Sequence, residues 1–219
     1  MNQATLGLFA LSVGLAPAVI LVNPTGVSND SGVSEFFPLG NIINNSGLSG
    51  AADFSNYTTI THGAAGAGTA WTTNNPNGAG DYFLASNPGT PAIVTFDLGG
   101  TFALTDLVYW GYHFGASNGN EVREFSLEFS SDGGGTFGGP VTVSSPLSTY
   151  AIGTAVTLPL GGTFTADTVR ATFTDNHFGG DAAGGDRLGL GEVKFVAVPE
   201  PSTTLLGGLA LLGLIRRKR

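Results

Sequence analysis

Residues Val122–Ser130 constrain the fold more than any other stretch, because apolar and polar side chains alternate along them with a period of two. Three apolar side chains fall on one face and three polar ones on the other: Phe125, Leu127 and Phe129, and Glu124, Ser126 and Glu128. Successive side chains of a β-strand point to opposite faces of its sheet. The pattern therefore predicts an antiparallel strand with one buried face.

Further short β-rich runs are separated by glycine-rich turns. They are Ala92–Leu98, Leu104–Tyr112, Ala155–Leu160, Thr168–Phe173 and Leu188–Val196. In the last run we expect Val193 and Phe195 to face the core, and Glu192 and Lys194 to face solvent. Glycine supplies 35 of the 219 residues, charged residues make up only 11%, and neither a convincing amphipathic helix nor an internal repeat is evident. The chain is therefore predicted to be an all-β sandwich or barrel.

The last 22 residues have three distinct parts. Pro199-Glu200-Pro201 forms an extended break, because each proline lacks a backbone donor and fixes φ. An uncharged apolar run, Thr203–Ile215, follows, and the chain ends in Arg216, Arg217, Lys218 and Arg219. A helix over residues 202–215 would span roughly 21 Å, whereas a bilayer core is about 30 Å thick. We expect a short hydrophobic helix that inserts transiently into a membrane. The alternative, a buried C-terminal helix of the domain, is disfavoured by the four terminal charges.

This order of parts, over Val198–Arg219, resembles the PEP-CTERM protein-sorting signal. The resemblance implies export in a Gram-negative bacterium, transient anchoring in the inner membrane, and removal of the anchor by an exosortase-type processing protease. It places the protein in the cell envelope or the extracellular matrix.

Residues 1–18 are expected to be a signal peptide. Leu6–Ala18 is apolar, and Ala16-Pro17-Ala18 offers small residues for cleavage. No Lys or Arg precedes the apolar run, although the start of a secretory signal is usually positive. Two alternatives stay open: that Leu6–Val22 belongs to a first strand, and that the start codon is assigned wrongly.

Several pieces of the central part occur in a familiar order. They are Ile42–Ser49, Asp53-Phe54, Tyr57, Thr69–Trp71, Val94–Gly99, Val122–Phe125, Ser130–Gly133, Val169–Thr172 and Gly189–Phe195. Over residues 35–197 this order resembles discoidin-like (coagulation factor type C-like) domains, and we assign residues 19–197 to such a domain. The resemblance implies a galactose-binding-like jelly roll of about eight strands, with sugar- or lipid-binding loops at one end. The cysteine pair of many animal members is missing, since the chain has no cysteine.

The charge balance argues against nucleic acid as a partner. The chain has 16 acidic and 8 basic residues, and four of the basic ones end the tail. Without the tail from Glu200 onward, 4 basic and 15 acidic residues leave a net charge of −11. Phosphate binding requires clustered cations, so neutral sugars or cations fit this surface better.

The discoidin-like resemblance also implies one structural calcium ion between the early loop and the last strand. Asp53 and Glu192 stand at the matching positions. Ca²⁺ takes six to eight oxygen ligands, so backbone carbonyls would complete the site. The alternative is that Asp53 is a turn or capping residue and Glu192 a solvated strand residue.

Candidate sugar-binding residues gather in two segments. A sugar site needs a flat ring beside a few fixed donors and acceptors. The strand that ends at Trp110 runs into a Gly/Asn-rich loop, and a second loop, 175–187, is rich in Asp and Gly. The candidates are Tyr112, His113, Phe114, Asn118, Arg123 and His177. The alternatives are that Trp110 and Phe114 are core residues and that the second loop is only a solvated connection.

Nothing in the sequence indicates catalysis. The chain lacks cysteine, its three histidines lie far apart, and no His-Glu-x-x-His or Gly-x-Ser-x-Gly motif occurs. Ser130–Phe137 fits one sialidase-type Asp-box, which we interpret as a hairpin turn. We therefore expect an exported, non-catalytic module that binds polysaccharide. A structural or adhesive matrix protein without a discrete site is the alternative, and a glycan-acting hydrolase is the least favoured.

Overall fold

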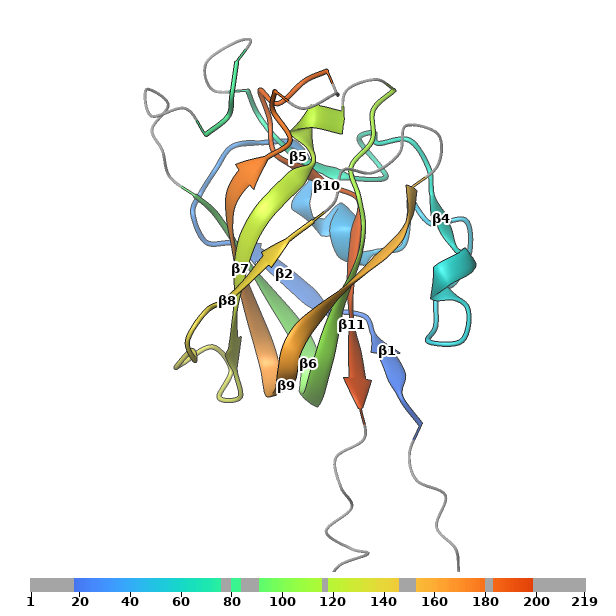
Figure 1. The fold of residues 1–219 in the computed structure, drawn as a ribbon, viewed down its shortest axis with the longest axis vertical. Coiled ribbons are helices and arrows are strands. Elements are labelled where there is room, and N and C mark those ends of the chain that lie inside the picture. Colours follow the sequence, from blue (N-terminus) through green and yellow to red (C-terminus); the bar gives the residue numbers. More distant parts are fainter. Residues whose placement is uncertain are drawn as a thin grey trace, which may run out of the picture. The chain divides into compact units, whose positions relative to one another are not determined.

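The structure is a computed structural model that describes residues 18–75, 80–83, 91–115, 118–145, 153–179 and 183–198 (Figure 1). Eleven strands are present in these residues: β1 (Ile20–Val22), β2 (Gly26–Asn29), β3 (Glu35–Phe37), β4 (Thr61–His62), β5 (Trp71–Thr73), β6 (Ala92–Trp110), β7 (Val122–Ser130), β8 (Val141–Ser144), β9 (Gly153–Asn176), β10 (Gly189–Leu190) and β11 (Glu192–Val198). Three short 3-10 helices accompany them: η1 (Leu39–Ile43), η2 (Tyr57–Thr59) and η3 (Asn118–Asn120). None of the helices in the described residues is long and apolar enough to cross a membrane. Residues 1–17 of the expected signal peptide and residues 199–219 of the tail, with its expected helix, lie outside them.

The strands form two antiparallel sheets. The larger has eight strands in the order β1-β11-β6-β9-β7-β8, with β2 paired to β6 and β4 paired to β9. The smaller has the order β10-β5-β3. The predicted all-β, antiparallel fold is confirmed, and β7 has the predicted limits, with Phe125, Leu127 and Phe129 buried.

The larger sheet folds over because β6 and β9 bend in their middle. The first arm of β6 pairs with β2 through Val94–Asp97, and the second arm pairs with β11 through Ala103–Trp110. Gly99 and Gly161 occupy the bends with φ of 72° and 76°, a region that glycine reaches without strain. Figure 1 shows the two arms diverging from the bends. The two layers enclose the main core, as in a β-sandwich.

The two ends of the sandwich differ. We call the end with Gly99–Phe102 and Gly161–Phe164 the bend end, and the opposite end, with residues 111–121 and 177–190, the loop end. β11 starts beside Trp110 at the loop end and finishes beside Ala103 near the bend end. The described chain therefore leaves the domain at the end opposite the loops (Figure 1).

A short repeat that the sequence reading missed marks the bend end. Gly-Gly-Thr-Phe occurs at residues 99–102, 134–137 and 161–164. The first glycine of each copy has a positive φ, and each copy makes a turn. In the middle copy Asp132 accepts hydrogen bonds from the Ser130 hydroxyl (2.6 Å) and the Thr136 N–H (2.9 Å). This geometry confirms that the Asp-box-like segment is a hairpin turn.

The predicted orientation of Glu192 and Lys194 toward solvent is wrong. Both side chains are buried, as are Val193 and Phe195 on the core side. The reason is that a second, smaller core covers the outer face of β11. Residues from the 48–60 segment and from β1 pack there against three side chains: Val108, Trp110 and Val196. Trp110 is therefore a core residue, and its Nε1–H donates to the carbonyl of Ile60 (2.9 Å).

Candidate functional site

The loop end has a rigid floor made by two buried asparagines. Asn120 Oδ1 accepts hydrogen bonds from the N–H groups of Gly185 (2.6 Å) and Arg187 (3.2 Å). Asn176 Nδ2 donates to the carbonyls of the same two residues, at 2.7 and 2.9 Å. Four hydrogen bonds thus fix a segment that sequence reasoning treated as a solvated loop, and neither asparagine was predicted.

Arg123, Asp175 and His177 form a polar cluster beside this floor, which we call the loop-end cluster. Arg123 lies at the start of β7 and forms an ion pair with Asp175 near the end of β9. The antiparallel pairing of β7 with β9 brings the two side chains together. His177 follows directly, and its backbone N–H donates to the carbonyl of Glu121 (3.1 Å). The structure therefore unites two of the predicted ligand residues and adds Asp175.

Two nitrogen atoms of this cluster have no hydrogen-bond partner in the described part of the chain, namely Arg123 Nε and His177 Nε2. Leaving a buried polar atom unpaired costs about 1–3 kcal/mol, so each atom marks a place where a hydroxyl group or a water is needed. Burial, and then the positive charge of Arg123, lower the pKa of His177. Its ring is thus mainly neutral at pH 7 and can hydrogen-bond without presenting a charge.

Two exposed phenylalanines lie on the loop-end segments. Phe114 is 53% exposed and Phe178 is 44% exposed. Phe178 lies against the pinned floor, since a Cβ added to Gly185 would sit 2.6 Å from Phe178 Cβ. Phe114 was predicted as a site residue, and Phe178 was missed although it follows His177 directly. Exposed aromatic rings beside fixed polar groups are what a sugar site requires.

The other predicted ligand residues are placed differently. Tyr112 is buried, and its ring lies 2.6 Å from where a Cβ on Gly189 would be. His113 is also buried, with Nε2 at 3.1 Å from the carbonyl oxygen of His62. Asn118 begins η3, but its side chain lies outside the described part. Burial keeps Tyr112 and His113 out of reach of a ligand in this structure.

The two predicted calcium ligands do not share a site here. Asp53 Oδ1 accepts hydrogen bonds from the N–H (2.7 Å) and the hydroxyl (2.6 Å) of Ser55. These bonds lower the pKa of the exposed Asp53 carboxyl. In the described residues no group of three His, Asp or Glu side chains is arranged to hold a metal ion. Calcium binding itself stays a prediction.

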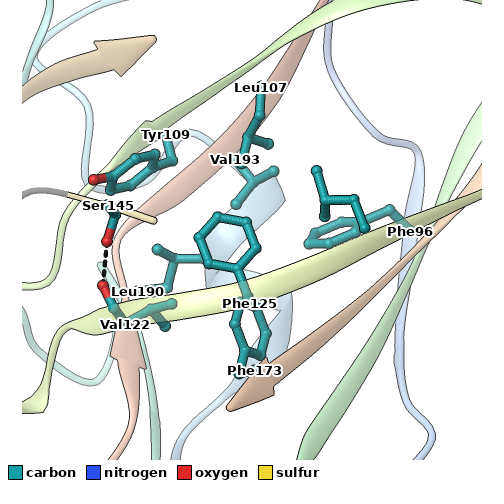
Figure 2. A pocket seen from close by; sticks show the side chains of 10 residues that line it. Phe96, Leu107, Tyr109, Val122, Phe125, Ser145, Phe173, Leu190 and Val193 are labelled. Carbon is teal, nitrogen blue, oxygen red and sulfur yellow. Dashed lines mark hydrogen bonds between the residues drawn. The ribbon is translucent and has the colours of Figure 1, made fainter. Parts of the chain in front are cut away.

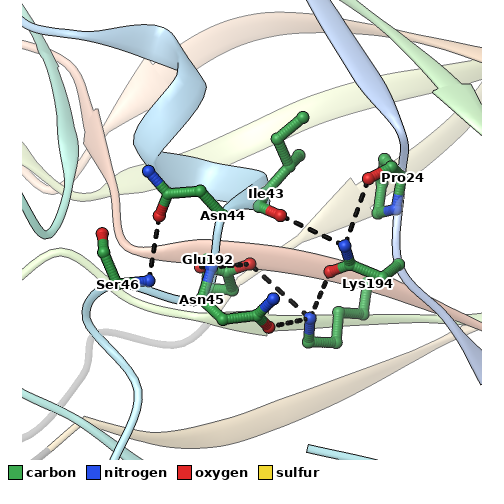
Figure 3. A network of polar contacts seen from close by, with 8 residues as sticks. Pro24, Ile43, Asn44, Asn45, Ser46, Glu192 and Lys194 are labelled. Atoms are coloured by element: carbon green, nitrogen blue, oxygen red, sulfur yellow. Dashed lines mark hydrogen bonds and ion pairs between the residues drawn. The ribbon is translucent and has the colours of Figure 1, made fainter. Parts of the chain in front are cut away.

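Glu192 instead belongs to a buried network with Lys194 (Figure 3). Glu192 Oε1 lies 3.6 Å from Lys194 Nζ, and both Glu192 oxygens accept the N–H of Asn45, at 3.3 and 3.1 Å. Burial raises the pKa of Glu192 to about 7, against the opposing effects of Lys194 and Asn45. Burial likewise lowers the pKa of Lys194. With an ammonium this close, Glu192 does not fit a divalent cation as it stands, because like charges repel strongly where water is absent.

A small void between the two layers is not a ligand site. Its volume is about 10 Å³, room for roughly one water. Figure 2 shows the apolar side chains that line it, among them Phe125, Phe173 and Val193. Near it the hydroxyl of Ser145 donates to the carbonyl of Val122, which ties the end of β8 to β7 below the loop-end cluster.

A family model described as the PEP-CTERM protein-sorting motif matches residues 197–219. The motif indicates export and association with the envelope of a Gram-negative bacterium. Its first two residues, Ala197 and Val198, belong to β11. A search of curated protein sequences finds no match.

Among solved structures the chain is similar to discoidin-like domains of the CBM32 type. One is a structure of the CBM32-1 and CBM32-2 domains from Clostridium perfringens ZmpB in complex with GalNAc, with a TM-score of 0.52, 14% identity, and coverage of 80% of this chain and 34% of that chain. Another is the family 32 CBM from C. perfringens NanJ in complex with galactose (TM-score 0.45, 12% identity, 82% and 99% covered). A third is CpGH89CBM32-5 from Clostridium perfringens in complex with GalNAc-β-1,3-galactose (0.46, 20%, 78% and 93%). The likeness shows the fold, a discoidin-like β-sandwich.

Proposed function

We propose that this chain is an exported, non-catalytic carbohydrate-binding protein whose ligand site is the loop-end cluster with Phe178. The observation that carries the proposal is the pair of unpartnered nitrogen atoms, Arg123 Nε and His177 Nε2, beside an exposed aromatic ring. The discoidin-like fold supports it, because the compared CBM32 structures hold galactose or GalNAc.

The chemistry of the cluster suits a neutral sugar. A hydroxyl group both donates and accepts, so one hydroxyl can accept from Arg123 while a neighbouring one donates to Asp175. Hydrogen bonds to charged groups are worth about 1.5–3 kcal/mol each. The ring of Phe178 would pack against the apolar face of the sugar. An anionic ligand is less well matched, since Asp175 already neutralises Arg123.

The sorting motif gives the proposal its cellular setting. An exosortase-type protease would remove the tail from Pro199 onward and leave the sandwich in the envelope or the extracellular matrix, facing polysaccharide. The ligand would be the cell's own extracellular material. The tail would serve only as a transient anchor in the inner membrane.

Calorimetric titration of the full chain in detergent with galactose and GalNAc tests the site. The proposal expects saturable binding, and a loss of at least about tenfold in affinity for Arg123→Ala, because one charge-assisted hydrogen bond is removed. Arg170→Ala is the matched control, since Arg170 also pairs with a carboxylate, that of Glu128, but lies outside the loop-end cluster. Equal loss in both variants, or no binding of either sugar or of any glycan on an array, would favour a structural or adhesive matrix role instead.

A further inference from the structure

The ammonium group of Lys194 lies in a cage of oxygen atoms. Lys194 is 1% exposed. Its Nζ donates to Asn45 Oδ1 at 2.6 Å and to Asn23 Oδ1, and Glu192 Oε1 lies 3.6 Å away. An ammonium has three donor hydrogens and no acceptor, so three oxygens match its full capacity.

The cage is assembled from three parts of the chain that are far apart in sequence. Glu192 comes from β11, Asn23 follows β1, and Asn45 follows η1. Asn45 has a φ of 62°, the left-handed conformation, which aims its N–H at the Glu192 carboxylate and its amide oxygen at Lys194 (Figure 3). Its φ is the only positive one among the described non-glycine residues.

Asn23 is held in place by its other amide atom. Its Nδ2 donates to the carbonyls of Pro24 and Ile43, both at 3.2 Å, which leaves Oδ1 directed toward Lys194. The three oxygens are thus fixed before they meet the ammonium. A carboxylate and two amide oxygens in fixed positions are also the donor set of a hard metal cation.

We infer that the Lys194 ammonium is the resident cation of this cage, in the place where a metal ion could bind if the lysine side chain were absent. The charge supports this, because one carboxylate balances one ammonium. Asp53 does not join the network, as it is bonded to Ser55 at the surface. The loop around Asn45 is therefore fastened to β11 without a divalent metal.

The inference is independent of the proposed sugar site, and thermal melting of the full chain tests it. For the wild type the melting temperature is expected to be the same in EDTA and in millimolar CaCl₂. Lys194→Ala is expected to melt about 10 °C lower in EDTA, because a buried carboxylate loses its partner. Calcium should then restore several degrees with saturation, because it binds the folded cage in preference to the unfolded chain.

Arg170→Ala is the matched control, because its ion pair with Glu128 is half-exposed; we expect a small shift and no calcium response. A Lys194→Ala chain that folds only in calcium supports the inference, and one that ignores calcium, or folds in neither condition, contradicts the latent metal site. The wild type decides the rest without any variant. A drop in its melting temperature on chelation, or calcium retained by it in native mass spectrometry, would overturn the role of Lys194.

Discussion

The two ion pairs beside β11 and β7 are built from the same chemistry and are placed in opposite surroundings. In the Lys194–Glu192 pair the side chains are 2% and 0% exposed, and Asn23 and Asn45 supply further hydrogen bonds. In the Arg123–Asp175 pair they are 44% and 22% exposed, and two nitrogen atoms of the cluster lack partners. A satisfied, buried pair can only hold the fold together, whereas a partly open, unsatisfied pair retains hydrogen bonds for a ligand.

The energetics follow from the same contrast. Removing one partner of a buried pair costs about 3–5 kcal/mol, because the other charge is left unpaired in the interior. An exposed pair contributes about 0–1 kcal/mol to stability. Substitutions in the first region should therefore change stability, and substitutions in the second should change binding.

The largest effect should come from Glu192→Leu. We expect the free energy of unfolding to fall by about 3–5 kcal/mol, because the Lys194 ammonium is left buried without its carboxylate. The double variant with Lys194→Met should recover most of that loss, since apolar side chains of similar length can fill the space. Urea denaturation measures both. If the single variant is as stable as the wild type, Glu192 and Lys194 do not depend on each other.

A smaller effect is expected at Asn45. Asn45→Gly keeps the left-handed φ of 62° but removes the amide oxygen from Lys194, at a cost of about 1.5–3 kcal/mol for a hydrogen bond to a charged group. Asn45→Ala should cost about 1–2 kcal/mol more, because a Cβ strains this conformation. Thermal melting ranks the variants. The reverse order would show that the backbone conformation matters little here.

The smallest effect belongs to His177 and depends on pH. Its pKa is lowered in the folded state, so the unfolded chain takes up a proton first as the pH falls. Stability is then fully present above pH 6.5 and declines as the pH drops below it. His177→Gln should flatten this part of the stability–pH profile. An unchanged profile in the variant would assign the pH dependence to another group.

The contrast also explains how far the sequence could be read. The alternation of β7 and the glycine-rich turns predicted the all-β sandwich, because these patterns are local and each strand face meets one environment. The same rule was wrong for Glu192 and Lys194. Their face of β11 is covered by Asn45 and by the 48–60 segment, about 140 residues earlier in the chain. No local pattern reports such a long-range contact.

The candidate site was predicted in part for a similar reason. Arg123 and His177 were identified by residue type, but Asp175 joins them only through the pairing of β7 with β9. Tyr112 and His113 have the right chemistry for a sugar, yet they are buried under the loop end. Burial and strand pairing decide which suitable side chains reach one place, and neither is written in the order of residues alone.

Chemical-shift mapping of the isotope-labelled full chain during a titration with galactose or GalNAc tests the central claim most directly. The account predicts saturable shifts at Arg123, Asp175, His177 and Phe178, and none at Asn45 or Lys194. Shifts confined to the bend end, or to the buried network, would contradict it.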